Sequence, residues 1–165
     1  MRKIIILSFL AILSFSTFAQ NKFGYIDSGE LLALMPEKKT AEDELQTFAK
    51  SLESQLGAMQ AEYQQSVQDF QNNESTYTDL VKQDKIAEIQ GLEQRIQSFQ
   101  QNAQNALQKK EQELLEPILT KARNAIEDVA KEERFTYIFD SSMGSILYVD
   151  ESENVLSLVR KKLGL

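Results

Sequence analysis

Residues 44–70 carry the sequence ELQTFAKSLESQLGAMQAEYQQSVQDF, and the spacing of its apolar side chains is the clearest structural signal in the chain. The apolar positions follow one another at intervals of three, four and four residues: Leu45, Phe48, Leu52, Leu56, Met59, Tyr63, Val67 and Phe70. The pattern repeats every eleven residues, about 3.67 residues per helical turn, which keeps the apolar side chains on one nearly straight face. This stretch therefore predicts one long amphipathic α-helix.

A second apolar stripe follows after a polar interruption, in which Glu74 takes an apolar place. Its members are Ile89, Leu92, Ile96, Phe99, Ala103, Leu107, Leu114 and Ile118. Two helices with one stripe each predict an antiparallel helical hairpin, with the turn between Asn72 and Lys85. Each arm of about 40 residues would be on the order of 60 Å long, too long for the rest of the chain to cover.

The composition between Pro36 and Pro117 supports this hairpin. No proline and only two glycines, Gly57 and Gly91, interrupt a segment dominated by Gln, Glu, Lys, Ala and Leu, which are strong helix formers. Sixteen Gln lie between Gln46 and Gln112 and give the arms a polar, weakly charged outer face.

The segments on either side of the hairpin have β character. We expect a strand at residues 22–27 and a β-hairpin formed by residues 135–140 and 145–149, with Ser141–Gly144 as its turn. Asp140 and Asp150 flank this hairpin and are expected to be turn residues rather than a catalytic pair. The fold class is therefore α+β, mostly α, with residues 20–36 and 118–165 as a small β-containing oligomerisation body and residues 37–117 as a helical hairpin arm.

Two short helices complete the expected body. The first begins at Asp27 or Ser28 and ends before Pro36, which then occupies the first turn of the long helix. The second follows a cap at Asp150 or Ser152 and ends before Gly164.

The first nineteen residues have the features of a secretory signal peptide. Arg2 and Lys3 precede an apolar run at residues 4–13, and small residues lead to a cleavage site after Ala19. Without Arg2 and Lys3, 16 Lys and Arg remain against 25 Asp and Glu, so the exported chain has a net charge of 16 − 25 = −9. This charge argues against nucleic acid as a partner.

The chain has no Cys and no His, which excludes a Ser-His-Asp triad, a thiol nucleophile and a soft-metal site. The Gly-rich sequences that bind nucleotide phosphates are also absent from it. We therefore expect no enzyme activity, no cofactor, no metal site and no small-molecule substrate.

A sheet of about three strands would leave unpaired edges, and joining several copies of the chain in a ring would remove them. This argument predicts a homo-oligomer whose helical hairpins project to one side. The alternative is a monomer with a lone hairpin, which would bury little core.

This layout resembles the periplasmic chaperones of the Skp/OmpH type. The resemblance covers essentially the whole mature chain. Six features carry it: residues 23–27, residues 30–36, the Gln-rich arms, Pro117–Ile118 with Ala125–Ile126, residues 137–140 and residues 159–163. It implies a jellyfish-like trimer with a small β body and three α-hairpin tentacles. It also implies an ATP-independent holdase that captures unfolded outer-membrane β-barrel proteins in the periplasm, in a cavity between the arms.

The best-known members of that family are basic, whereas this mature chain is acidic, so capture is expected to depend on apolar contact and arm flexibility. The candidate client-binding residues are Met59, Tyr63, Phe70, Tyr77, Leu80, Ile96 and Phe99. Apolar residues at this spacing are also what two helices need to pair, and Tyr77 and Leu80 fit the stripes least well. The alternative function is a structural coiled-coil scaffold of the cell envelope.

Overall fold

The computed structural model describes residues 21–165, so the predicted signal peptide at residues 1–19 lies outside the described part of the chain. Two compact units divide these residues. The unit that we call the sheet unit contains the described residues up to Leu31 together with Arg123–Leu165. The second, which we call the arm unit, contains Leu32–Ala122. Helices α2 and α4 each contribute residues to both units.

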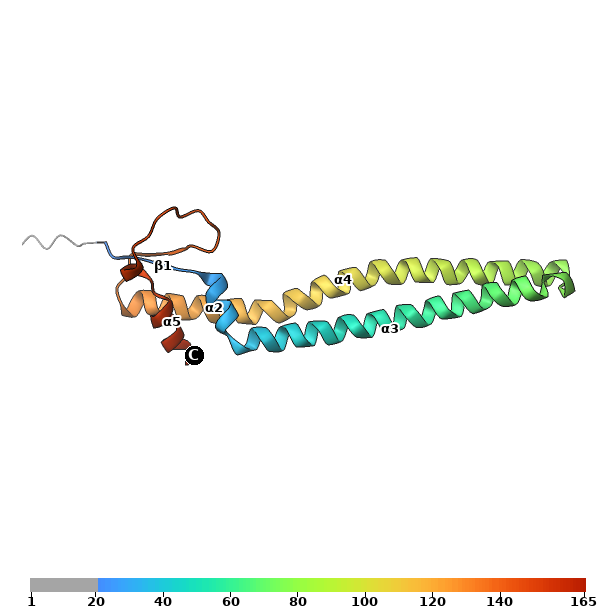
Figure 1. The fold of residues 1–165 in the computed structure, drawn as a ribbon, viewed down its shortest axis with the longest axis horizontal. Helices are drawn as coiled ribbons and strands as arrows, with labels where there is room; N and C mark the ends of the chain where they lie inside the picture. Colours follow the sequence, from blue (N-terminus) through green and yellow to red (C-terminus); the bar gives the residue numbers. More distant parts are fainter. Residues whose placement is uncertain (1–20) are drawn as a thin grey trace, which may run out of the picture. The chain divides into compact units, whose positions relative to one another are not determined.

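The sheet unit is built on two parallel strands. Strand β1 (Phe23–Ile26) pairs in register with β2 (Tyr137–Asp140), so that Phe23 faces Tyr137 and Ile26 faces Asp140. The second edge of β1 contacts Asn154 through an isolated bridge, and Val155 donates its backbone N–H to the Tyr25 carbonyl at 2.9 Å. Strand β1 is therefore the central element, although it lies far from its partners in the sequence (Figure 1).

The predicted β-hairpin is wrong. Residues 135–140 supply β2, but residues 145–149 form no strand, and β2 pairs in parallel with β1 instead. The chain turns out of β2 because the Asp140 carboxylate accepts the N–H of Ser142 at 2.9 Å, and Gly144 then adopts a left-handed φ of 66°. The apolar alternation of residues 145–149 suits a strand, yet within residues 21–165 no strand pairs with this segment.

The core of the sheet unit is apolar. Its buried side chains come from β1, from α2, from the end of α4 (Asp79–Glu132), and from α5 (Leu156–Leu163) and the residue before it. They include Ile26, Leu31, Ala125, Val129, Val155 and Val159. Gly24 lets β1 approach closely, since an added Cβ would lie 2.9 Å from both Phe135 Cε1 and Val155 Cγ1. The parallel pair thus depends on a position without a side chain.

The helix boundaries follow local chemistry. Helix α2 (Ser28–Leu34) begins where the Asp27 carboxylate accepts the Glu30 N–H at 2.9 Å, as predicted. Met35 is extended (φ −79°, ψ 122°) because it precedes Pro36, and α3 (Pro36–Asn73) starts with that proline in its first turn.

At the C-terminal end of the chain, Asp150 caps a short 3₁₀ turn (η2, Glu151–Glu153) rather than the helix itself. The side chain of Asn154 accepts the Leu156 N–H that opens α5, so neither Asp150 nor Ser152 begins this helix. Gly164 ends α5 in the left-handed conformation (φ 76°), as predicted.

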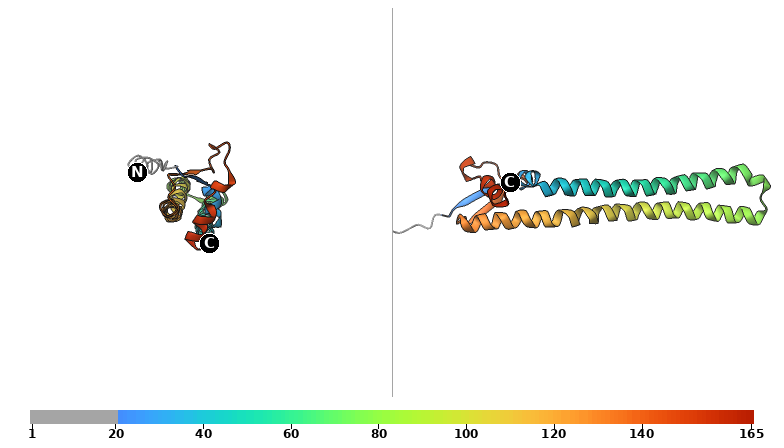
Figure 2. Two further views of the ribbon diagram at one scale, coloured as in Figure 1. Left: turned by 90° about the vertical axis from the view of Figure 1, so that its left-hand side faces the viewer. Right: turned by 90° about the horizontal axis from the view of Figure 1, so that it is seen from below.

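The arm unit is an antiparallel pair formed by α3 and the residues of α4 up to Ala122, which run side by side in both views (Figures 1 and 2). The turn lies at Glu74–Thr76, a 3₁₀ turn (η1), within the predicted range of residues 72–85. Thr78 caps α4 by accepting the Val81 N–H at 3.4 Å. The helical hairpin is therefore confirmed.

Candidate binding surfaces

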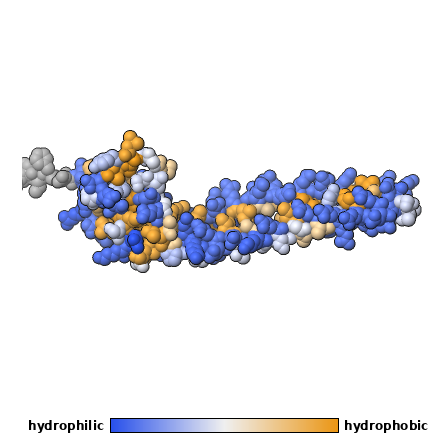
Figure 3. All heavy atoms as spheres, in the orientation of Figure 1, coloured by the Kyte–Doolittle hydropathy of each residue, from blue (hydrophilic) through white to orange (hydrophobic). Residues whose placement is uncertain are grey.

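The two predicted stripes form one seam along the arm unit. All eight α3 members of the predicted stripe, from Leu45 to Phe70, are half-buried, and so are most of the α4 members. Only Leu92 and Ile118 of the two stripes are fully buried. Two helices can cover each other from one side only, so the seam keeps part of its apolar surface open to solvent (Figure 3).

Five of the seven candidate binding residues lie in this seam: Met59, Tyr63, Phe70, Ile96 and Phe99. Each is half-buried, so each pairs with the facing helix and also presents part of its side chain to solvent. Leu80 is different, since it is 70% exposed on the first turn of α4. The structure therefore brings five candidates into one line and leaves Leu80 free of the seam.

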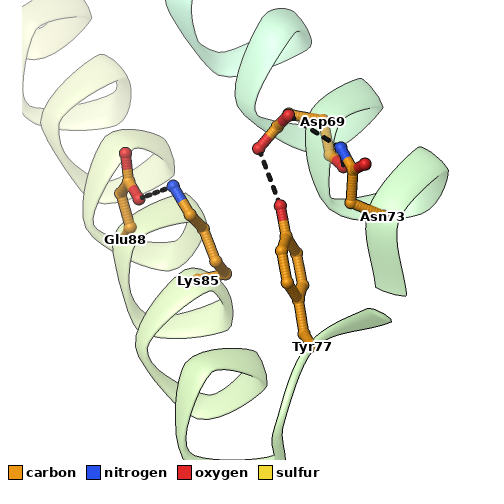
Figure 4. Close-up of polar contacts among 5 residues, drawn as sticks. All are labelled: Asp69, Asn73, Tyr77, Lys85 and Glu88. Atoms are coloured by element: carbon orange, nitrogen blue, oxygen red, sulfur yellow. Dashed lines mark hydrogen bonds and ion pairs between the residues drawn. The ribbon is translucent and has the colours of Figure 1, made fainter. Parts of the chain in front are cut away.

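Tyr77 is anchored rather than free. Its ring lies 6.4 Å from that of Phe70, and its hydroxyl donates to Asp69 at 3.1 Å (Figure 4). Asn73 donates to the other Asp69 oxygen at 3.0 Å, so Asp69 ties the end of α3 to the turn. Partial burial raises the pKa of Tyr77, and the hydrogen bond to the Asp69 carboxylate raises it further.

Lys85 and Glu88 lie beside this group on α4 (Figure 4). Their Nζ and Oε2 atoms are 3.0 Å apart, and the hydrogen bond and charge of Glu88 raise the pKa of Lys85. We call Asp69, Asn73, Tyr77, Lys85 and Glu88 the tip cluster. Within it, the polar contacts of Asp69 with Asn73 and Tyr77 connect the end of α3 to the residues after the turn.

Ion pairs join the helices at the opposite end of the arm unit. Lys121 bonds to Glu37, and Lys110 lies 3.7 Å from Glu44. The bond from Lys121 lowers the pKa of Glu37. Within residues 21–165 no ion pair joins α3 to α4 between Glu44 and the tip cluster, so only the apolar seam connects the helices there.

A groove opens on this middle part of the arm unit. Its volume is about 460 Å³, and it is lined from α3 by Ala49, Leu52, Glu53 and Leu56 and from α4 by Phe99, Gln100, Ala103, Gln104 and Leu107. Two alanines leave the space that larger side chains would fill. The spacing of apolar residues predicts the stripe positions but not this groove. Periodicity shows which residues share a helix face, and it does not show how closely two faces pack.

The sheet unit presents a second apolar surface. Phe23, Tyr137 and Phe139 stack on one face of the sheet, with ring centroids 5.9 to 6.4 Å apart, and all three are exposed. Beside them, residues 145–149 border a groove of about 550 Å³, and Leu147 is 99% exposed. Large apolar side chains open to solvent at this density are typical of an interaction surface.

The acidic residues of the sheet unit have structural roles. Ser28 donates its hydroxyl to Asp140 at 2.6 Å. Partial burial alone would raise the pKa of Asp140, but its hydrogen bonds with Ser28 and Ser142 outweigh that effect and lower the pKa to about 2. Asp150 accepts the Ser152 N–H at 2.9 Å. Both aspartates are turn residues, as predicted.

Two kinds of feature are absent from the described residues. No helix among residues 21–165 is long and apolar enough to cross a membrane. In the same part of the chain, no group of three or more acidic side chains is arranged to hold a metal ion.

The family model described as "Outer membrane protein (OmpH-like)" matches residues 22–163. This match spans both units, and the chain therefore belongs to the OmpH family, as the resemblance of its sequence had implied. The mostly helical fold with a small sheet agrees with a solved structure from Caulobacter crescentus CB15, titled as a candidate outer membrane chaperone (OmpH-like). The TM-score is 0.77 at 14% identity, covering 88% of this chain and 85% of that one.

Curated relatives agree with the family. The chain is 26% identical over 163 residues to the chaperone protein Skp of Photorhabdus laumondii, covering 94% of each chain. The Skp protein of Photorhabdus luminescens matches with the same identity and coverage.

Proposed function

We propose that the protein is an ATP-independent holdase chaperone that binds unfolded outer-membrane β-barrel proteins in the periplasm. Membership of the OmpH family supports the chaperone class. The single observation that carries the holdase mechanism is the seam, a line of half-buried apolar side chains along both helices of the arm unit. Many weak apolar contacts on linked arms bind an unfolded chain by their number, without nucleotide and without a deep pocket.

We propose further that the protein works as a homotrimer assembled through the sheet unit. The exposed aromatic face of Phe23, Tyr137 and Phe139 and the exposed segment 145–149 offer the apolar area that an assembly would bury. Segment 145–149 also has strand-like alternation and pairs with no strand among residues 21–165. Pairing with a neighbouring chain would satisfy its backbone groups and enclose a client cavity between the arms.

The chaperone proposal is tested by aggregation of an unfolded β-barrel membrane protein diluted from urea. The full mature chain is expected to prevent light scattering at a near-stoichiometric ratio, equally with and without ATP, and with little loss on raising the salt concentration. A scaffold protein of the cell envelope would leave the aggregation unchanged. A steep loss with salt would contradict capture by apolar contact.

A matched pair of variants tests the role of the exposed end of α4. Leu80→Gln removes the candidate residue that is 70% exposed, and Leu119→Gln makes the same change at a leucine of α4 that is 44% exposed and is not a candidate. Capture is expected to fall for Leu80→Gln alone. An equal fall for both would indicate that exposed apolar area matters wherever it lies.

The trimer is tested by the mass of the native particle. The wild-type chain is expected to give three times the chain mass, and the double substitution Tyr137→Ser with Phe139→Ser is expected to give the monomer. A wild-type monomer with full chaperone activity would contradict the trimer and leave the holdase proposal standing.

A further inference from the structure

One stretch of each helix in the arm unit carries little charge. Residues 96–108 of α4 contain no Asp, Glu, Lys or Arg, and Arg95 and Lys109 flank them. Glu62 is the one charged residue among residues 54–68 of α3. Most exposed positions of the α4 segment are Gln or Asn, and those of the α3 segment are Gln, Ser, Gly and Ala besides Glu62. We call the two segments the amide band. The solvated face of a helix usually mixes charges of both signs, so stretches of 13 to 15 residues with at most one charge are unusual.

The groove of about 460 Å³ lies between the α4 segment of the amide band and residues 49–56 of α3. Leu52, Leu56, Phe99 and Leu107 give it an apolar lining, and the amides of Gln100 and Gln104 lie at its rim. Glu53 is the only charged residue among those that line it. Within residues 21–165, neither rim amide forms a side-chain hydrogen bond, so both are available to an occupant. Figure 3 shows apolar side chains along the arm bordered by hydrophilic ones.

This composition selects the chemistry of the occupant. Nucleic acids and anionic lipid headgroups need cations, and the lining has none. A helix has satisfied almost all its backbone groups, so its surface leaves the two rim amides little to bind. An extended polypeptide, in contrast, carries free N–H and C=O groups that side-chain amides pair with, because each amide both donates and accepts.

We propose that this groove binds a short extended segment of an unfolded polypeptide, with its apolar side chains against Leu52, Leu56, Phe99 and Leu107 and its backbone paired with Gln100 and Gln104. The inference rests on the proposed holdase function and names the chemistry of the segment that the arm selects. It is an uncharged stretch in which apolar and polar residues alternate, the pattern of a membrane β-strand.

The dimensions agree with such an occupant. Residues four apart on a helix are about 6 Å apart along its axis, which is the step from Phe99 to Ala103 and from Ala103 to Leu107. Alternate side chains of an extended chain are roughly 6.7 Å apart on one face. Two or three successive apolar side chains of the client therefore align with the groove.

The first experiment measures binding of a peptide that carries a rhodamine label with no net charge, by fluorescence anisotropy on the full mature chain. The peptide has about ten residues, alternating Leu or Tyr with Ser or Thr, and no net charge. The variant Gln100→Glu with Gln104→Glu places two charges at the rim. Its control, Gln97→Glu with Gln101→Glu, makes the same change at the same spacing on α4, at two exposed positions that do not line the groove.

The rim variant is expected to bind the peptide on the order of fivefold more weakly than the wild type, and the control within about twofold. The reason is that a carboxylate cannot donate to the C=O groups of the peptide and must be desolvated when the peptide covers it. Circular dichroism spectra of the two variants should match. Equal affinities of the two variants would overturn the proposal.

The second experiment locates the peptide. Because the natural chain has no Cys, the single variants Glu53→Cys and Gln101→Cys each carry one environment-sensitive fluorophore, the first in the groove and the second outside it. The peptide is expected to change the emission at residue 53 alone. A change at residue 53 on raising the protein concentration without peptide would mean that a second copy occupies the groove, which overturns the proposal.

The holdase function and the binding role of the groove are tested by different outcomes. If the wild type leaves an unfolded β-barrel protein to aggregate, the holdase function fails. If the wild type prevents aggregation and the rim variant binds the peptide as the control does, only the groove assignment fails.

Discussion

The sheet unit and the arm unit use similar apolar side chains to different ends. Ile26, Leu31 and Val159 of the sheet unit are at most 2% exposed, whereas Leu52 and Leu56 of the arm unit are only half-buried. In the sheet unit, strand and helices approach the same point from several directions. In the arm unit, two antiparallel helices lie side by side and each covers only one side of the other, so part of the apolar surface stays exposed to solvent.

The difference shows how one chain combines stability with a binding surface. A closed core contributes stability in a few places, while a half-open seam spreads smaller contributions along many turns and keeps part of each side chain free. Substitutions in the two units should therefore lower the free energy of unfolding by different amounts, and the following experiments test this difference.

The largest expected effect is a cavity in the sheet unit. Leu31→Ala removes a side chain with 0% exposure and should lower the free energy of unfolding by about 3 kcal/mol. Leu56→Ala makes the same change in the half-buried seam and should cost only about 1 kcal/mol, because water already reaches that side chain. Urea denaturation of both variants measures the difference. Equal costs would contradict the contrast between closed core and open seam.

A second pair of substitutions replaces a glycine by alanine in each unit. Gly24→Ala places a Cβ 2.9 Å from Phe135 and Val155 and should lower the free energy of unfolding by about 2 kcal/mol. Gly57→Ala lies inside α3 with nothing within 4 Å and should instead stabilise by about 0.5–1 kcal/mol, since alanine favours helix. Thermal and urea unfolding measure both. A stabilising Gly24→Ala would show that β1 is not tightly packed.

A third prediction concerns acid. The pKa of Asp140 is lowered from 3.8 to about 2 in the folded chain, so its ionised form stabilises the fold above pH 3.8. That contribution should be lost as the pH falls from about 4 to 2. Asp140→Asn should therefore lose less stability than the wild type over this range, measured by urea denaturation at each pH. The neutralising change Glu93→Gln in the arm unit serves as the control, and an identical pH dependence of Asp140→Asn and wild type would refute the assignment.

The smallest expected effect is at the tip cluster. Tyr77→Phe removes the hydroxyl that donates to Asp69 at 3.1 Å and leaves the ring beside Phe70. Amide hydrogen exchange should become faster around residues 69–79, while the midpoint of global unfolding stays unchanged, because the contact is local and exposed. A shift of the global midpoint would mean that the tip cluster holds the whole hairpin.

The arm was largely predictable because its signals are local. The 3-4-4 spacing of residues 45–70 indicated the helix, Pro36 marked its beginning, and the polar run after Asn72 located the turn. These features act within a few residues of the chain, so an isolated sequence displays them. The same locality explains the correct end of α5 at Gly164.

The candidate site was predictable only in part. Periodicity placed Met59, Tyr63, Ile96 and Phe99 on one face, but it could not show that they are half-buried or that Ala49 and Ala103 open a groove. It also offered no reason to separate Tyr77, which is bound to Asp69, from Leu80, which is exposed.

The sequence alone therefore determined the helical hairpin, its turn and its family, since each depends on repeated local patterns. Tertiary structure alone decided the strand pairing. Residues 135–140 and 145–149 look like a hairpin when they are considered together, yet β2 pairs with β1, which is more than a hundred residues away. Local pattern shows that a segment suits a sheet, but the partner is chosen by packing, here by Phe135 and Val155 against Gly24.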